Sequence, residues 1–554
     1  MSDATLNNGP TGAGGLAGSS SRPEMGGKPH IGGAVGFLLV LTAGLGYAAF
    51  SIATDISNAG EHNLAIGALV LLGLALLIAL GFEFVNGFHD TANAVATVIY
   101  THSLPPLVAV VWSGTFNFLG VLTSSGAVAF TIVTLLPVEL ILQVGSGAGY
   151  AMIFALLIAA IIWNLGTWAM GLPNSSSHAL IGSIMGVGLA NQLLAPAGSA
   201  TSGVDWNQAV GVLKALLFSP VIGFVLSALL LLLMKAVVRT KSLYTAPVGN
   251  KPPPPAIRAL LVLTCTGVSF FHGSNDGQKG MGLIMLILIG AAPTAYALNR
   301  AIPESTTPAF LQVTQNAQAV FQSHAGTAAP PPAAAQARDI AAQARDIVSA
   351  ALRTRQVNTP EVYGALATLT GDIGSQVKNY GAIRLIPAGA TQNVRNDMYL
   401  ASDAVRVMGA HPEGFDSAAL GQLKSLRASF EAGTRFIPIW VKVSVALALG
   451  LGTMIGWKRI VVTVGEKIGK THLTYAQGAS AEIVAMATIG LADMYGLPVS
   501  TTHVLSSGVA GAMAANGSGL QWGTIKNMAL AWVLTLPAAM VIAGSLYVIL
   551  RQIF

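Results

Sequence analysis

Long apolar blocks constrain this chain more than any other feature, because about 20 consecutive apolar residues suffice to cross a lipid bilayer as a helix. Several blocks approach or reach that length: Gly36–Ile56, Leu64–Phe84, Ala148–Met170, Val221–Met234, Phe436–Gly456 and Met528–Leu550. Only 9% of the 554 residues are charged, whereas a soluble domain carries about 25%. We count about ten passes, some of them interrupted, and predict an all-α polytopic protein of the lipid bilayer.

The basic residues lie mainly in short connectors between apolar blocks, as expected for cytoplasmic loops. The connector Lys235–Arg258 contains lysines and arginines and no acid, and Trp457–Lys470 is also rich in basic residues. The net charge of +6 therefore says little about nucleic acid, and we expect no nucleic-acid partner. The single cysteine, Cys265, lies inside an apolar block, which excludes an intrachain disulfide.

Two motifs occur twice, in the same order. Gly-Leu-Pro-Asn-Ser-Ser-Ser-His at 171–178 recurs as Gly-Leu-Pro-Val-Ser-Thr-Thr-His at 496–503, and Gly-Phe-His-Asp at 87–90 is matched by Gly-Ser-Asn-Asp at 273–276. The sequence therefore predicts two homologous halves. The first pair is 325 residues apart and the second 186, so the second half holds 139 extra residues between its motifs.

The extra residues form a polar stretch with a tandem Ala-Ala-Gln-Ala-Arg-Asp-Ile at 334–340 and 341–347, which is typical of a soluble helix. The sequence does not decide on which side of the membrane this stretch lies. We divide the chain into a disordered N-terminal tail (1–35), a first membrane half (36–235), a cytoplasmic linker (236–257), a second membrane half in two parts (258–298 and 436–554) and a soluble helical insertion (299–435) between those parts.

Ionisable residues inside apolar blocks are costly, so each is a functional hypothesis. The candidates are Glu83, His89, Asp90, Asp276, Lys279, Glu482 and Asp493, with His178, His272 and His503. Asp90 and Asn93 are three residues apart and share one helical face. Gly87 and the polar residues around it predict a helix interrupted within the membrane, which is tolerated where the backbone lines a cavity.

Three of these candidates have a structural alternative. Glu83 equally suits an anchor near a helix end, and Glu482 lies far from the motifs in sequence. Lys279 is three residues after Asp276, so the two can pair with each other rather than contact a substrate. The sequence leaves these alternatives open.

The Gly-Leu-Pro element ends one helix, and the hydroxyl residues after it are favoured caps for the next. A helix that starts there points its free N–H groups and several hydroxyls at one place, which is an anion site. The predicted ligands are Ser175, Ser176, Ser177, Ser500, Thr501 and Thr502. A protonated phosphate can also donate its O–H to Asp90 or Asp276, whereas sulfate cannot; these carboxylates equally suit a coupling proton or cation.

These motifs resemble those of the PiT family of inorganic phosphate transporters, most closely its bacterial low-affinity branch. The matching stretches are 84–100, 163–186, 271–280 and 496–511. The resemblance implies an inverted-repeat fold with broken and re-entrant helices, symport of inorganic phosphate across the bacterial inner (plasma) membrane, and no enzymatic activity or cofactor. By position it assigns substrate binding to Asn275 and the six hydroxyl residues. We assign Asp90, Asn93, Asp276 and His89 to the coupling ion, with Glu83, Glu482 and Lys279 as secondary candidates.

Two departures from the family pattern concern the coupling ion. Sodium-coupled members typically have Gly-Ala-Asn-Asp with a later Asn, whereas here His89 replaces the first Asn and Lys279 stands at the later position in the second copy. A lysine disfavours a sodium site, and a histidine that titrates near neutral pH favours a proton. The resemblance also implies a neutral complex of phosphate with Mg or another divalent metal as part of the cargo, and no resident metal site.

The alternatives are a sodium-coupled phosphate symporter, a sulfate or divalent-cation carrier on the same fold, an intramembrane Ser/His hydrolase and a structural scaffold. A duplicated Ser/His pair gives a hydrolase no advantage, and the polar motifs argue against a scaffold. A homodimer is a candidate assembly.

Overall fold

The computed structural model describes Pro23, Met25 and residues 31–60, 66–90, 92–136, 138–142, 144–195, 203–247, 249–326, 337–410 and 414–554, without the side chains of 92–93, 138–139 and 337–339. Most of the predicted tail lies outside these residues, but 31–35 belong to a helix rather than to a tail. The described part is helical and contains no strand, which confirms the predicted all-α class.

Seven helices in the described part are long and apolar enough to cross a membrane. They are α1 (Ile31–Asn58), α2 (Ile66–Asp90) with α3 (Ala92–Tyr100), α4 (Pro106–Thr123), α7 (Gly147–Ala169), α9 (Trp206–Val237), α10 (Pro255–Ala291) and α21 (Trp522–Leu550). A bent pair, α16 (Ser417–Thr434) and α17 (Ile439–Thr453), raises the number to eight.

This is fewer than the expected ten, because three further helices of the membrane part are too short or too polar to qualify. They are α8 (Ser176–Leu193), α19 (Tyr475–Met494) and α20 (Thr501–Asn516). At 1.5 Å per residue, α20 is only about 24 Å long, less than the hydrocarbon thickness of about 30 Å. These helices carry or adjoin the duplicated motifs.

Each long helix that follows one Gly-Leu-Pro motif packs on the short helix that carries the other motif. α9 follows α8 in the chain but packs on α20, and α21 follows α20 but packs on α8. Both long helices contain a proline, Pro220 in α9 and Pro537 in α21. A twofold pseudo-axis between the halves would produce this reciprocal arrangement; the inverted repeat itself stays a prediction.

The two Asp-containing motifs have different local structures. The first copy is at the end of α2, where the helix stops at Asp90 and α3 begins at Ala92, with Thr91 outside the described residues. The second copy lies within α10, which continues without a break through Gly273 and Asp276. The interruption expected from the first motif therefore has no counterpart in the second.

Two glycines allow α4 and α10 to touch backbone to backbone. A Cβ atom at Gly120 would lie 2.0 Å from the carbonyl oxygen of Phe270, and one at Gly273 would lie 2.1 Å from that of Asn117. Small residues at such contacts are typical of helix pairs in membranes. The contact places Asn117 of α4 beside the second Asp-containing motif.

Gly273→Val is expected to destabilise the fold, because the side chain would have to push α4 away from α10. Overpacking of this kind costs about 1–3 kcal/mol and occasionally more. Thermal unfolding of the detergent-purified protein should show a clearly lower Tm. Gly166→Val is the matched control, since Gly166 is on α7 with no other side chain or backbone near its Cβ position; equal Tm values for the two variants would refute the close approach.

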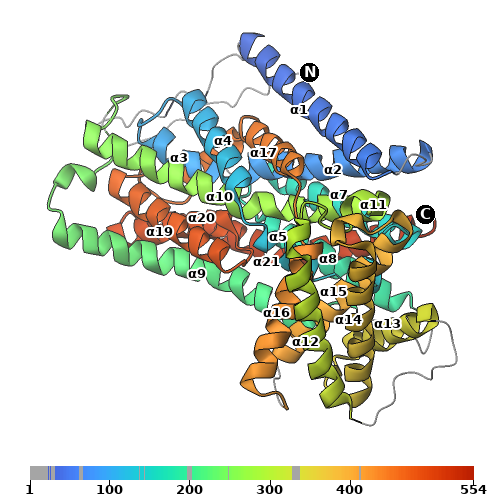
Figure 1. Ribbon diagram of the computed structural model, residues 1–554. Coiled ribbons are helices and arrows are strands. Elements are labelled where there is room, and N and C mark those ends of the chain that lie inside the picture. Colours follow the sequence, from blue (N-terminus) through green and yellow to red (C-terminus); the bar gives the residue numbers. More distant parts are fainter. Residues whose placement is uncertain are drawn as a thin grey trace.

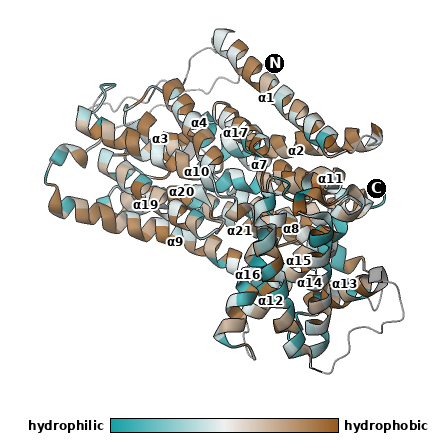
Figure 2. Cartoon of the chain, viewed as in Figure 1, coloured by the Kyte–Doolittle hydropathy of each residue, from teal (hydrophilic) through white to brown (hydrophobic). Residues whose placement is uncertain are grey.

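The segment between α11 (Pro293–Tyr296) and α17 forms a helical group with its own hydrophobic core. It contains α12 (Thr307–Ala325), α13 (Ala337–Thr354), α14 (Pro360–Tyr380), α15 (Ala388–Ala410) and α16. Figure 1 shows this group projecting from one end of the membrane helices, and Figure 2 shows that hydrophilic residues are concentrated on it. Arg406 holds it to the membrane part through Asp205, just before α9 (3.4 Å).

Candidate functional site

Both Gly-Leu-Pro elements form a tight turn followed by a capped helix, as predicted. Gly171 and Gly496 have positive φ angles of 67° and 64°, a conformation that glycine adopts without strain. The side chain of Ser175 caps α8, and that of Ser500 caps α20, each by accepting from a backbone N–H three residues later. Each helix start therefore presents its remaining N–H groups and hydroxyls.

The two helix starts face each other inside the protein. The rings of His178 on α8 and His503 on α20 have centroids 4.5 Å apart, and Trp532 of α21 packs 4.3 Å from His503. The Trp532 indole N–H donates to the carbonyl of Pro173 at 2.9 Å, which ties α21 to the first turn. The hydroxyl clusters of the two motifs thus converge on one region.

A single carboxylate joins the two clusters. Ser176 Oγ donates to Asp90 Oδ2 at 2.6 Å, and Thr502 Oγ1 donates to Asp90 Oδ1 at 2.7 Å. His89 Nδ1 lies 3.2 Å from the same Oδ1, and its Nε2 is 3.3 Å from Thr167 Oγ1. All these side chains are buried, so the site is closed to solvent in this structure.

The second aspartate forms an adjoining cluster with a buried lysine. Lys279 Nζ is 2.7 Å from Asp276 Oδ1 and also donates to Ser177 Oγ at the start of α8. Ser177 Oγ in turn donates to the carbonyl of Val499 at 3.0 Å. Lys279 has no exposed surface, so its charge is balanced within the protein by Asp276.

Two of the predicted substrate ligands, Asn275 and Thr501, differ in the hydrogen bonds that they make within the protein. The Asn275 amide donates to the carbonyl of Leu497 at 3.0 Å and accepts from the N–H of Val499 at 3.4 Å, so it holds the second turn in place. Thr501 Oγ1 is buried and has no hydrogen-bond partner among the described residues, which leaves it able to bind a ligand.

Two secondary candidates for the coupling ion, Glu83 and Glu482, lie near different parts of α10. Glu83 accepts from Asn86 at 3.3 Å and packs directly on Gly280, the residue after Lys279. Glu482 accepts from Thr264, near the other end of α10. The side chain of Asn93 falls outside the described residues.

Residues outside the duplicated motifs complete the site, and the sequence patterns did not identify all of them. Asn117 Oδ1 is 2.7 Å from His272 Nδ1, and His272 Nε2 is 3.6 Å from Asp276 Oδ2. Ligand atoms of Asp90, His272 and Asp276 lie within 4.8 Å of one another, a spacing that suits a metal ion. His272, four residues before Asp276 on one helix face, was among the candidates that the sequence offered, whereas Asn117 and Thr167 were not.

Residues 86–543 match the phosphate transporter family. The chain belongs to this family. It is 41% identical over 497 residues to the low-affinity inorganic phosphate transporter PitA of Escherichia coli, covering 88% of this chain and 97% of that protein. A low-affinity inorganic phosphate transporter of Buchnera aphidicola is 39% identical over 490 residues, 86% of this chain and 96% of that protein. A solved chain described as "the sodium-dependent phosphate transporter" aligns with a TM-score of 0.47 at 19% identity, covering 88% of this chain and all of that one.

Family membership and the apolar helices make this transporter a multi-pass protein of the plasma membrane. Its relatives are named transporters rather than enzymes. Ser175 Oγ caps α8 by accepting from the backbone N–H of His178 at 3.2 Å, and it also lies 2.9 Å from His178 Nδ1.

Proposed function

We propose that this chain imports inorganic phosphate together with protons and binds the phosphate between the starts of α8 and α20. One observation carries the proposal: Asp90 accepts one hydroxyl from each helix start, Ser176 and Thr502. The carboxylate thereby occupies the donors that an oxyanion would use. Helix N-termini and their hydroxyls favour anions by charge and by hydrogen bonding.

The neighbouring carboxylates support phosphate over sulfate. A protonated phosphate has an O–H that can donate to Asp90 or Asp276, whereas sulfate at neutral pH has only acceptors. The relatives in Escherichia coli and Buchnera aphidicola are named inorganic phosphate transporters, in agreement with this choice.

Proton coupling follows from the competition at Asp90. When ionised, its carboxylate holds the Ser176 and Thr502 hydroxyls and repels an incoming anion. Protonation removes the charge and weakens both hydrogen bonds, so that the hydroxyls become available to phosphate. His89, 3.2 Å from Asp90, is placed to exchange the proton. Proton and phosphate binding then favour each other, which is the thermodynamic basis of symport.

The position of Lys279 favours a proton over a sodium ion as the coupling ion. Its ammonium group already supplies a positive charge between Asp276 and Ser177. A sodium ion at the same place would face a buried like charge and find its carboxylate already paired. The ammonium also adds positive charge beside the proposed phosphate site.

A metal–phosphate complex is the second candidate cargo, and the grouping of Asp90, His272 and Asp276 favours it. Carboxylate oxygens are preferred ligands of divalent cations such as Mg²⁺. In this case the metal enters and leaves as a neutral complex with phosphate, so that it adds no net charge beside Lys279 as a free sodium ion would.

Uptake of radiolabelled phosphate into proteoliposomes tests the proposal, with a pH gradient and a sodium gradient imposed separately. A tenfold change in the proton ratio is worth about 1.4 kcal/mol, so one inward pH unit should drive about tenfold accumulation per coupled proton. The sodium gradient should have no effect. Uptake that follows sodium would refute proton coupling, and no uptake under either gradient would refute the cargo. Dependence of the rate on added Mg²⁺ separates metal-bound from free phosphate.

A further inference from the structure

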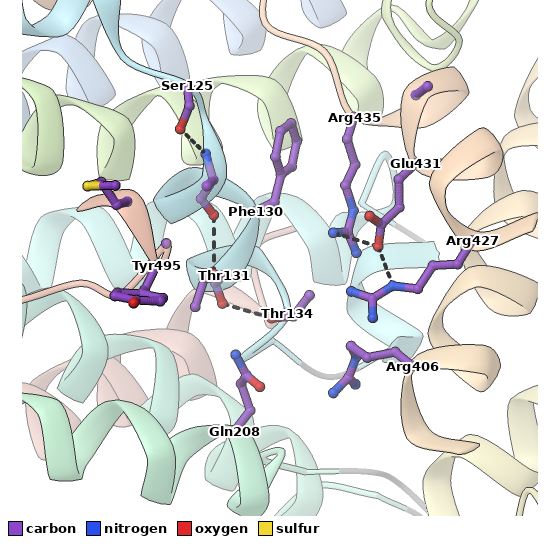
Figure 3. A pocket seen from close by; sticks show the side chains of 14 residues that line it. Ser125, Phe130, Thr131, Thr134, Gln208, Arg406, Arg427, Glu431, Arg435 and Tyr495 are labelled. Carbon is purple, nitrogen blue, oxygen red and sulfur yellow. Dashed lines mark hydrogen bonds and ion pairs between the residues drawn. The ribbon is translucent and has the colours of Figure 1, made fainter. Parts of the chain in front are cut away.

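A cavity of about 600 Å³ lies where the helical insertion meets the membrane helices. Figure 3 shows the side chains of Arg406, Arg427 and Arg435 reaching toward it from one side. The opposite wall comes from α5 (Ala127–Val133), the adjoining Ser125 and Thr134, Gln208 of α9 and the turn at Tyr495 and Gly496. Both the insertion and the membrane part are therefore needed to form it.

The arginines of this cavity exceed the acids available to pair with them. Glu431 accepts from both Arg427 (2.8 Å) and Arg435 (2.9 Å), so this group keeps one net positive charge. Two small cavities share wall residues with the large one. Together the three are lined by Arg353, Arg355, Arg395, Arg406, Arg427 and Arg435 and by the acids Asp205, Asp403 and Glu431.

Arg395 is the clearest case of a positive charge at these cavities that lacks a counter-ion. Its guanidinium is buried and lies beside the Tyr399 ring. Among the described residues it has no carboxylate partner, and it donates only to the Ile141 carbonyl and the Asn396 amide oxygen (3.3 and 3.1 Å). Burial lowers the pKa of Arg395 to about 10, so the group stays charged at neutral pH. A buried charge without a counter-ion is costly, and an anion in the adjoining space would offset that cost.

The cavity wall connects directly to the central site. Gly496 lines the cavity, and the next residue, Leu497, accepts from Asn275, the neighbour of Asp276. The N–H of Val128 in α5 donates to Gln278 Oε1 at 2.9 Å, the residue before Lys279. Two parts of the wall thus contact α10 beside the Asp276–Lys279 pair.

We propose that this cavity is a vestibule that binds inorganic phosphate through its arginines before the anion passes to the central site. The inference rests on the phosphate site proposed at Asp90. Guanidinium groups bind phosphate oxygens through paired N–H donors, and a basic cleft raises the local concentration of an anion. An anionic phospholipid headgroup offers the same phosphate chemistry, so the test must separate the two sources.

The triple variant Arg427→Gln/Glu431→Gln/Arg435→Gln removes the net charge without leaving an unpaired acid. In proteoliposomes we expect its half-saturation concentration for phosphate to rise about fivefold, with a maximal rate within about twofold of wild type and a smaller difference at high salt. The control Arg384→Gln breaks an exposed ion pair with Glu304 on the same insertion and should leave both values unchanged. An unchanged half-saturation concentration in the triple variant would overturn the vestibule, whereas absence of phosphate transport by wild type would overturn the central site.

A second measurement needs no variant. Phenylglyoxal modifies accessible arginines, and mass spectrometry of the wild-type protein locates the modified sites. Phosphate should slow modification of Arg427 and Arg435 but not of Arg384, equally in phosphatidylcholine and in phosphatidylglycerol vesicles. Protection by phosphatidylglycerol with no effect of phosphate would assign the cavity to a lipid headgroup and overturn the proposal, as would no protection by either.

Discussion

Asp90→Asn is expected to lower the initial rate of proton-driven phosphate uptake by about 100-fold, equivalent to about 2.8 kcal/mol, because the variant lacks the carboxylate that couples phosphate to the proton. Asp90 accepts from Ser176 and Thr502 through its two oxygens. Asparagine has one oxygen, so it must turn an NH₂ group toward one of the hydroxyls. It also cannot gain or lose the proton that links phosphate binding to the pH gradient.

The measurement compares uptake with the amount of protein in the vesicles, so that reduced insertion is not mistaken for reduced transport. Asp55→Asn is the matched control. Asp55 also accepts from two side chains, Tyr296 (2.8 Å) and Trp440 (3.0 Å), but it is at the end of α1 and not in the site. We expect this control to keep most of the activity. Uptake by Asp90→Asn within about threefold of wild type would contradict the role of Asp90, since a charged buried contact is worth more than that.

The local features of the site were predictable from the sequence because they depend on neighbours in the chain. A glycine, a proline and a run of hydroxyl residues specify a helix end and a capped helix start without reference to the rest of the protein. The structure places Ser175 and Ser500 at these caps. The membrane class was predictable for a similar reason, since it follows from the length of apolar segments.

The long-range features were not predictable, because they depend on which helices pack together. Nothing in the sequence near Thr167 or Asn117 shows that they contact His89 and His272. Seven or eight helices of the described part qualify as spans by length and composition, against about ten expected, because an apolar stretch can also form a short helix buried among others. Both ends of the Asn275 amide contact the backbone of the second turn, and its predicted binding of substrate stays a prediction.

The sequence left Lys279 with two interpretations, a pair with Asp276 or a contact with substrate. The structure places its ammonium group against Asp276 and also against Ser177 at the start of α8. The two interpretations are therefore compatible, because one charge can balance the aspartate and still face the proposed phosphate site.

Lys279→Met is expected to abolish uptake and to destabilise the protein. The methionine fills similar volume but leaves the Asp276 carboxylate buried without its cation, which costs about 3–5 kcal/mol. The uptake rate should fall at least about 100-fold, since the same change removes a positive charge from the region that receives the anion. Thermal unfolding in detergent and uptake in proteoliposomes measure the two effects separately. Lys442→Met is the control, because Lys442 is partly buried in α17 and its ammonium donates to a carbonyl, that of Ser124 (2.7 Å), with no carboxylate left behind.

The double variant Lys279→Met/Asp276→Asn distinguishes a structural ion pair from a functional one. Removing both charges eliminates the unpaired carboxylate, so the Tm should return most of the way to that of wild type. Uptake should not return with it, because phosphate would still lack the ammonium group beside Ser177. If stability and transport recovered together, Lys279 would serve only to balance the charge of Asp276. The argument that Lys279 disfavours a sodium site would then fail. If the single variant kept both normal stability and proton-driven uptake, the buried pair would have neither role.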